Sequence, residues 1–410
     1  MIHGISRGKS AVDLGLIHYP IRMTSIPSNA AESHRKKRLV WMDFAKGIAV
    51  LWVVYFHFFI NYLDPAPTPT SGHFINDVFD GFGPVDSFAS KISVWLKIGW
   101  LALSQLGFHA VGMFLVLGGW ALGASTCKKA EREPIEWRTW YFQRFTRLYP
   151  MYWVGHLALL LLPFTWIEHV DHHFLVSLTG IRFLRVQEDF YYGNASWWYF
   201  GMLVQFYFIF PVLFWLLRRL GRVGFLLSAF AVGFGLRYLL LEVWHSHGYW
   251  VQGANCLSRL PEFALGMVAG VSHMSAPEKV EKWLLRWPAL CTGLFMYAWI
   301  PRLYAGSAYI FADVYSAIAC TLCVANVVGF LQGSEFLAKW IPLVGSYSFG
   351  IFLLHQPLVT WFGLKLTELS ILQFVAVAIP TLIVIASLGI SVESKVNVIV
   401  ERLLGSAKAQ

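Results

Sequence analysis

Two ionisable side chains, Lys46 and His57, stand eleven positions apart in an apolar segment that follows the basic run at residues 35–38. Placing an ionisable group in hydrocarbon costs several kcal/mol, so each is by default a hypothesis about function. Eleven positions are close to three helical turns, which puts both on one helix face, roughly 16 Å apart along the axis. The same stripe also includes Asp43, Val50, Val53 and Asn61. The pattern indicates a cation that can meet an anion at one end and a titratable group toward the other.

The composition of the 410-residue chain is that of a membrane protein. Hydrophobic residues make up 57% of it and charged residues only 13%, whereas soluble domains carry about 25% charged residues. The formal net charge of +9 could indicate nucleic-acid binding, but the cations stand in short clusters between apolar segments. Such clusters are typical of loops retained on the cytoplasmic side of a membrane. We therefore predict a polytopic protein whose partner is the lipid bilayer and not a nucleic acid.

About ten apolar runs are long enough to cross a bilayer as helices, which takes roughly 17 to 25 residues. They predict an all-α fold with about ten transmembrane helices. The expected helices are approximately 44–63, 98–124, 148–167, 196–217, 223–244, 257–274, 287–303, 308–331, 342–364 and 370–392.

Segments rich and poor in Lys and Arg alternate along this series. The rich segments precede the first, third, fifth, seventh and ninth expected helices. By the positive-inside rule these segments are cytoplasmic, so both termini are expected on the cytoplasmic side. Residues 1–34 are polar and aperiodic, which predicts a disordered cytoplasmic tail. The expected organisation is this tail, a transmembrane domain over 35–395 and a cytoplasmic C-terminal tail over 396–410.

Further polar side chains are expected at the depth of His57. Depth follows from the distance to the outer end of each helix, at about 1.5 Å per residue. The side chains that this count places in the outer half or the middle of the membrane are His109, Gln205, Arg259, Glu262 and His355. Polar groups at one depth can converge on a shared cavity. Alternatively, each makes an interhelical hydrogen bond, and Arg259 and Glu262 neutralise one another.

Six short motifs occur between residues about 39 and 390. They are a basic residue, ten residues and a histidine within 43–57; GMFLVLGGW at 112–120; RFTRLYP at 144–150; WWYF at 197–200 with QFY at 205–207 and a proline at 211; RLPEFALG at 259–266; and GSYSFGIFLLHQP at 345–357. Together they resemble the acyltransferase-3 family of bacterial integral membrane O-acyltransferases. Lys46 stands where arginine is commoner, Gly118 where serine is usual, and Leu203 where many members have glutamate. The missing glutamate argues against a mechanism that needs an acid there.

The resemblance implies acyl transfer to a hydroxyl group. In this family a cytoplasmic acyl-CoA delivers its acyl group to a sugar, polysaccharide or lipid-linked glycan outside, and no cofactor is tightly bound. Neutral imidazole is both base and nucleophile near pH 7, so His57 is the expected catalytic residue, whether it deprotonates the acceptor or is itself acylated. His355 ranks second and His109 third. Substrate binding is expected of Asn61, Gln205, Arg259 and Glu262.

Cations at the inner mouth are expected to hold the phosphates of the acyl-CoA. Lys46 supplies one charge, and Arg144 and Arg147 supply planar guanidinium groups three residues apart, a geometry suited to phosphate. The alternative role of these arginines is positive-inside topology alone, because any cytoplasmic loop shows such residues.

No metal site is expected. A cluster on an outside loop contains Glu168, His169, Asp171, His172 and His173. The helical His-x-x-x-His spacing of a zinc site is absent, so a solvated loop is the preferred interpretation.

Two classes of function remain open. In an enzyme, the polar residues form a donor site inside and an acceptor site outside; in a transporter, they line a path for an anionic or sugar-containing substrate. The lack of visible repeats and of paired broken helices favours the enzyme. The resemblance further implies a multi-pass protein of the bacterial inner membrane, with acetyl as the default acyl group and a polysaccharide-synthesis complex as a candidate partner.

Overall fold

The computed structural model describes residues 28–62, 88–162, 170–303, 306–331, 333–363 and 369–406. Within these ranges the chain consists of helices joined by turns and loops, with no strand. The predicted all-α fold is therefore confirmed. Residues 1–27, most of the predicted N-terminal tail, lie outside the described residues.

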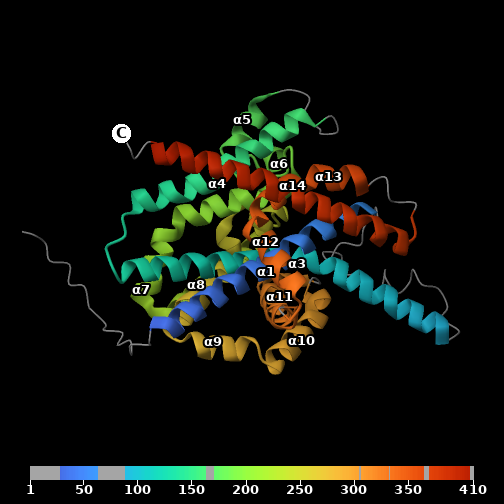
Figure 1. Ribbon diagram of the computed structural model, residues 1–410, viewed down its shortest axis with the longest axis horizontal. Helices are drawn as coiled ribbons and strands as arrows, with labels where there is room; N and C mark the ends of the chain where they lie inside the picture. Colours follow the sequence, from blue (N-terminus) through green and yellow to red (C-terminus); the bar gives the residue numbers. More distant parts are fainter. Residues whose placement is uncertain are drawn as a thin grey trace, which may run out of the picture.

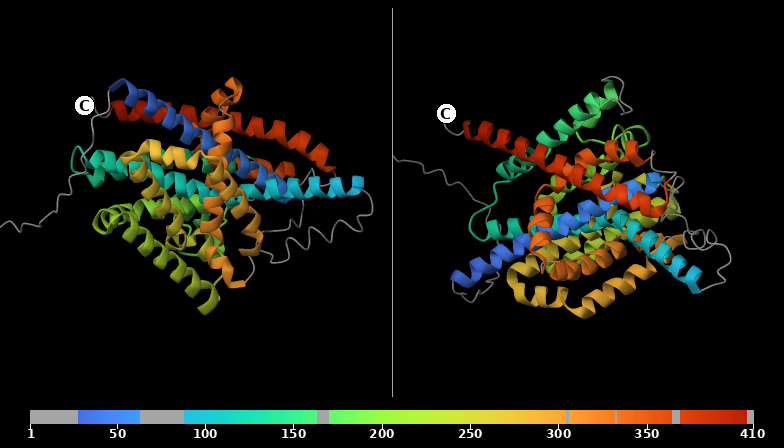
Figure 2. Two further views of the ribbon diagram at one scale, coloured as in Figure 1. Left: turned by 90° about the horizontal axis from the view of Figure 1, so that it is seen from below. Right: turned by 45° about the vertical axis from the view of Figure 1, so that its right-hand side comes forward.

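The longer helices are α1 (Ser28–Tyr62), α3 (Phe88–Ala130), α4 (Trp137–Leu161), α7 (Trp198–Tyr238), α8 (Leu260–Ser275), α10 (Trp287–Leu303), α11 (Tyr309–Leu331), α12 (Glu335–Ser346), α13 (Ser348–Gly363) and α14 (Ile371–Ser406). Short helices connect them: α5 (His172–Leu178), α6 (Val186–Asp189), α9 (Pro277–Leu284), and the single turns η1 (Ala195–Trp197), η2 (Leu239–Val243), η3 (Trp250–Ala254), η4 (Cys256–Arg259) and η5 (Gly306–Ala308). In Figure 1, α1, α3, α4 and α14 run along the long axis, whereas α11 is seen almost end on. The left view of Figure 2 shows α11, in orange, crossing these helices steeply.

Five helices of the described chain are long and apolar enough to cross a membrane, or six if α12 and α13 count as one bent span. The ten expected segments all overlap helices, but α8 and α10 have only 16 and 17 residues. The arginines of α4 lower its hydropathy, and the apolar stretch Ala195–Val243, counted as one span, contains two expected spans separated at Gly221. The number of crossings therefore stays a prediction.

Several element boundaries differ from the expected ones. α1 begins at Ser28, inside the predicted disordered tail, and α14 continues to Ser406, through most of the predicted C-terminal tail. The expected spans 196–217 and 223–244, by contrast, are two helices within α7, separated where Gly221 (φ 70°, ψ 178°) leaves helical geometry. This backbone conformation is readily accessible only to glycine.

The segment 342–364, expected as one helix, is instead two. α12 and α13 meet at an angle of 81°, because the chain leaves helical geometry at Tyr347 (φ −110°, ψ 22°). Just before the bend, Gly345 packs against the backbone of Asp43, so closely that a Cβ atom would overlap its carbonyl. The bend thus lies directly against α1.

Glycines also allow α3 and α8 to pack closely. A Cβ atom at Gly119 or Gly123 would overlap the backbone of α8, and one at Gly266 or Gly270 would overlap the backbone of α3. Small residues spaced four apart on both helices allow such close backbone approach, which is a common way of packing helices in membranes. The expected motifs at 112–120 and 259–266 therefore meet in space.

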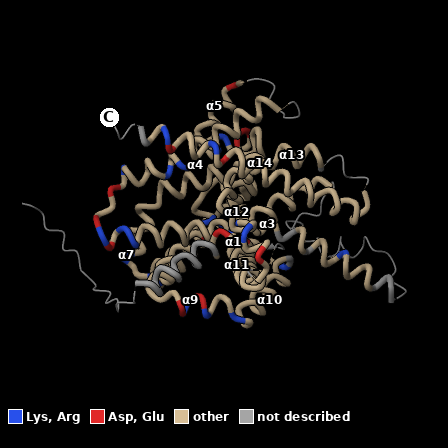
Figure 3. The backbone as a smooth tube through the Cα atoms, in the orientation of Figure 1, with Lys and Arg blue, Asp and Glu red and all other residues tan. Residues whose placement is uncertain are grey.

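The hydrophobic core is built around α1. Phe44, Ala49, Val54 and Phe58 are fully buried there, against apolar residues of α3, α4, α7, α11, α13 and α14. Charged residues gather instead near helix ends and connections, as Figure 3 shows around the left end of α4 and α7 and along α9. An ionisable side chain on the inward face of α1 is consequently surrounded by protein.

Candidate active site

His57 of α1 and His355 of α13 lie in direct contact, although they are 298 positions apart. Nδ1 of His57 is 3.1 Å from Nε2 of His355, and the ring centroids are 4.9 Å apart. His355 is fully buried, whereas His57 keeps partial exposure. The structure thus brings together the two histidines that the sequence ranked first and second.

Backbone carbonyls decide which ring nitrogens of this pair carry protons. Nδ1 of His355 is 2.7 Å from the carbonyl oxygen of Phe352, and Nδ1 of His57 is 2.8 Å from that of Val53. A carbonyl oxygen only accepts hydrogen bonds, so we assign a proton to each Nδ1 in the neutral rings. The Nδ1–H of His57 is then shared between Val53 and Nε2 of His355. This leaves Nε2 of His57 unprotonated and free to take a proton.

Asn61 lies one turn beyond His57 on α1. Its Nδ2 donates to the carbonyl oxygen of His57 at 2.6 Å. The amide oxygen of Asn61 has no hydrogen-bond partner among the described residues, and the side chain is partly exposed. Asn61, one of the residues expected to bind substrate, therefore has an amide oxygen beside His57 that can accept a hydrogen bond.

Lys46, three turns before His57, is neutralised by a carboxylate of its own helix. Its Nζ lies 2.7 Å from Oδ1 of Asp43, and the two side chains are 27% and 29% exposed. Oδ2 of Asp43 accepts a hydrogen bond from Ser346 of α12 at 3.4 Å. The cation is thus accessible where α1 meets the bend between α12 and α13.

Arg144 and Arg147 lie one turn apart on α4 in different surroundings. The guanidinium of Arg144 is stacked over Trp140, 5.2 Å from the ring centre, and its buried Nε has no hydrogen-bond partner in the part of the chain that the structure describes. Arg147 is exposed and interacts electrostatically with Glu393 of α14. Glu393 in turn accepts the backbone N–H of Gly350, in the first turn of α13, at 2.7 Å. Arg147 therefore lies near the start of the helix that carries His355.

The third expected histidine, His109 of α3, belongs to another cluster. It is buried and interacts electrostatically with Asp313 and Arg259. Asp313 of α11 accepts from Arg237 of α7 at 2.7 Å and lies 3.6 Å from Arg259. Arg259 donates to Glu262 at 2.5 Å. Two guanidinium groups and two carboxylates thus pair inside the protein, in the way that the alternative interpretation of Arg259 and Glu262 describes.

Gln205 bridges α7 and the segment that precedes α8. Its Nε2 donates to the carbonyl oxygen of Ala254 at 3.2 Å, and its Oε1 accepts the backbone N–H of Cys256 at 3.1 Å. Because both ends of the amide are bonded to backbone, the side chain ties two segments together.

The family model described as Acyltransferase domain matches residues 39–390, a range that contains His57, His355 and every motif noted above. The chain belongs to this acyltransferase-3 family. Comparison with curated proteins and with solved structures found no match. The resemblance inferred from six short motifs is therefore confirmed, and the apolar helices mark the protein as a membrane acyltransferase.

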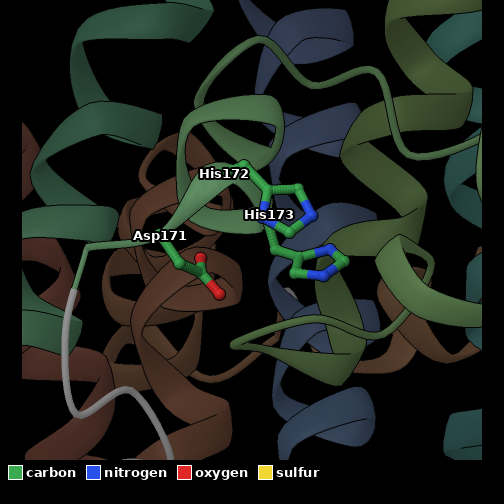
Figure 4. A group of neighbouring side chains, drawn as sticks. All are labelled: Asp171, His172 and His173. Carbon is green, nitrogen blue, oxygen red and sulfur yellow. The ribbon is translucent and has the colours of Figure 1, made fainter.

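A second group of ionisable side chains of the acyltransferase surrounds the start of α5. Figure 4 shows Asp171, His172 and His173, whose potential ligand atoms lie within 4.8 Å of one another. Asp171 caps α5 by accepting the N–H of Phe174 at 2.8 Å, a bond that lowers the pKa of this partly exposed carboxyl. Nδ1 of His173 lies 2.6 Å from the buried carboxylate of Asp189 in α6. These contacts secure α5 against α6; Glu168 and His169 lie outside the described residues.

Two charged residues of the acyltransferase core were not singled out from the sequence. Arg237 and Asp313 interrupt the apolar runs 223–244 and 308–331. A charge within such a run was a usable signal, because a charge in hydrocarbon needs a partner. The pairing itself could not be read from the sequence, since the two residues are 76 positions apart.

Proposed function

We propose that this acyltransferase moves an acyl group from cytoplasmic acyl-CoA to a hydroxyl group of an extracytoplasmic polysaccharide, glycan or glycolipid. The observation that carries the proposal is the contact of His57 with His355, which leaves Nε2 of His57 available as a base. A base that has a free lone pair and a fixed ring is what hydroxyl activation needs.

In the proposed reaction, Nε2 of His57 takes the proton of the acceptor hydroxyl while the hydroxyl oxygen attacks the thioester carbonyl carbon. The new C–O bond forms, the C–S bond of the donor breaks, and the imidazolium returns its proton to the leaving thiolate. While His57 is charged, its Nδ1–H stays bonded to Val53 and His355. Hydrogen bonds to a charged group are stronger than those to a neutral one, so these acceptors stabilise the imidazolium.

The proposed donor site lies at the other end of the α1 stripe. Lys46, Arg144 and Arg147 would bind the phosphates of acyl-CoA, with phosphate replacing Asp43 as the partner of Lys46. Arg147 is exposed and Arg144 is partly exposed, so phosphate can reach both guanidinium groups. The separation of Lys46 and His57, roughly 16 Å along the helix, leaves room for the extended arm of CoA to bring the thioester to His57.

The proposed topology has about ten crossings of a bacterial inner membrane and both termini in the cytoplasm. Its support is the alternation of cation-rich segments, together with the placement of the start of α1 and the end of α14 at one end of the molecule (Figures 1 and 2). The acceptor would approach from the opposite end, where the amide oxygen of Asn61 can accept a bond from a sugar hydroxyl. Gln205, Arg259 and Glu262 are occupied by protein partners, so we assign them no acceptor contact.

A transporter of an anionic or sugar-containing substrate is the second candidate. The 81° break between α12 and α13 favours it, because broken helices line the substrate sites of many transporters. Uptake of labelled glycan into proteoliposomes, in the absence of any acyl donor, would support this candidate over the first.

The test of the enzyme proposal uses the purified protein with radiolabelled acetyl-CoA and glycan extracted from the envelope of cells that lack the gene. Label should pass to the glycan with the native protein and not with His57→Ala. Equal labelling by both proteins would refute the role of His57. Labelled His57 recovered by mass spectrometry would instead show that the imidazole is itself acylated.

A further inference from the structure

One carbonyl group of α13 receives two hydrogen bonds from a distant part of the chain. The indole Nε1 of Trp197 donates to the carbonyl oxygen of Leu353 at 3.0 Å, and Nδ2 of Asn194 donates to the same atom at 3.2 Å. The donors are 156 and 159 positions away in sequence. Trp197 is fully buried and Asn194 is 2% exposed, so neither bond competes with bulk water.

The carbonyl of Leu353 is available because of a proline. In an α-helix this oxygen would accept the N–H of the residue four positions later, which here is Pro357. Proline has no N–H, so the oxygen of Leu353 is left without its helical partner. An unpaired carbonyl inside a membrane protein is costly, and the side chains of Trp197 and Asn194 supply the missing donors.

This carbonyl lies directly beside the one that orients His355. Nδ1 of His355 is bonded to the carbonyl of Phe352, the residue before Leu353. Successive carbonyl groups therefore bond to the histidine ring and to the Trp197 and Asn194 donors. A shift of the Leu353 peptide plane would shift the Phe352 carbonyl, and with it the ring that meets His57.

The two donors are themselves held rigidly. Oδ1 of Asn194 accepts the backbone N–H of Ser196 at 3.0 Å, which starts the η1 turn. The indole of Trp197 packs against Tyr152 of α4, with ring centroids 5.1 Å apart. Arg182, also buried, lies over the same indole at 5.4 Å.

Arg182 also secures the connection that leads to these donors. Its Nη1 donates to the carbonyl oxygens of Asp189 at 3.2 Å and of Tyr192 at 2.9 Å. The connection between α6 and α7 is thus a fixed platform for Trp197 and Asn194.

We propose that Trp197 and Asn194 are positioning residues for acyl transfer, which act by holding the Leu353 carbonyl so that His355 keeps its contact with His57. The inference rests on the proposed function, because it gives the His57 and His355 pair a catalytic purpose. Neither residue touches the reacting atoms; both act through α13.

The test compares two variants with a matched control. The measured quantity is the rate at which thiol is released from acetyl-CoA in the presence of envelope glycan. Trp197→Phe keeps the aromatic ring but removes the N–H donor. Asn194→Ser keeps an oxygen that can cap η1 but cannot reach Leu353. Trp215→Phe, on α7, the helix that follows η1, and 61% exposed, is the control.

We expect kcat to fall about 10-fold in Trp197→Phe, the effect of one lost hydrogen bond in a buried site. Asn194→Ser should show a similar fall, whereas Trp215→Phe should match the native protein. The KM for acetyl-CoA should stay within twofold in all three, and the pH midpoint of kcat should move only in the two site variants, because the environment of His57 changes. The inference is overturned if kcat is unchanged in both variants, or if it falls only in proportion to folded protein with no change of the pH midpoint.

His57→Ala, assayed in the same preparation, separates this inference from the function on which it rests. Activity retained by His57→Ala means that the proposed function has failed. Loss of activity in His57→Ala, with native kcat in Trp197→Phe and Asn194→Ser, means that only the positioning role has failed.

Discussion

Arg237 of α7 donates a 2.7 Å hydrogen bond to Asp313 of α11, and both side chains are buried. Asp313 also lies 3.6 Å from Arg259, which precedes α8. One carboxylate therefore joins three segments that are remote in sequence. Arg237 has no other ion-pair partner among the described residues, whereas Arg259 is also paired with Glu262.

Removal of this carboxylate should destabilise the protein strongly. Asp313→Leu leaves Arg237 buried without its ionic partner, which we expect to lower the free energy of unfolding by about 3–5 kcal/mol. The double variant Arg237→Met with Asp313→Leu should lose less than the two single variants added together. Thermal unfolding in detergent measures this, with Arg219→Met, which is exposed in α7 before the break at Gly221, as control. Strictly additive losses would show that the two residues are not coupled.

Substitution of His57 should lower kcat more than substitution of His355. His57→Ala removes the base and should lower kcat by at least about 100-fold. His355→Ala should lower it by only about 10-fold, because the Nδ1–H of His57 keeps its bond to the Val53 carbonyl. Steady-state kinetics at equal membrane abundance distinguish the two. A greater loss in His355→Ala than in His57→Ala would assign the base to His355 instead.

The cations of the proposed donor site should act on KM. Lys46→Ala, Arg144→Ala and Arg147→Ala should each weaken acyl-CoA binding about 10- to 100-fold, since each removes a charge-assisted bond to phosphate. Arg138→Ala, which removes an exposed cation from the same α4 helix, is the control. Calorimetric titration with CoA gives the affinities directly. Native affinity in all three variants would return these residues to a purely topological role.

Substitution by alanine should affect the adjacent glycines Gly118 and Gly119 of α3 differently. A Cβ atom at Gly119 would overlap the carbonyl of Phe263 in α8, whereas one at Gly118 meets nothing within 4 Å. Gly119→Ala should therefore reduce the amount of folded protein in the membrane, and Gly118→Ala should leave it unchanged. Fluorescence-detected size-exclusion chromatography of tagged protein compares the two. Equal profiles would mean that α3 and α8 can separate without loss of the fold.

Residue type and helical spacing predicted much of the candidate site but not its contacts. Counting residues along an apolar run estimates depth, which placed His57 and His355 at one level. It carries no information on which way a side chain points around the helix axis. For that reason His109, expected at the same depth, could not be assigned to the Arg259 cluster. The contact of Trp197 with Leu353 depends on long-range packing, so it could not be predicted from the sequence either.

The sequence pattern also did not predict the local backbone geometry at the bend between α12 and α13. The run 342–364 is continuously apolar, so nothing in its periodicity indicates the bend at Tyr347. The bend arises where Gly345 lets α12 press against the backbone of Asp43, a tertiary contact with no counterpart in the hydropathy of the segment. The pairing of Lys46 with Asp43, in contrast, follows from their three-residue spacing on one helix.

The bent segment gives the two ends of the α1 stripe a common mechanical support. Its first arm, α12, reaches the partner of Lys46 through Ser346, and its second arm, α13, carries the partner of His57. Any change in the angle between the arms alters both contacts at once. If phosphate drew Lys46 away from Asp43 and moved α12, the bend would carry this movement to α13 and change the contact of His57 with His355. Binding of the proposed donor and the geometry of the proposed base would then be coupled through one bent segment.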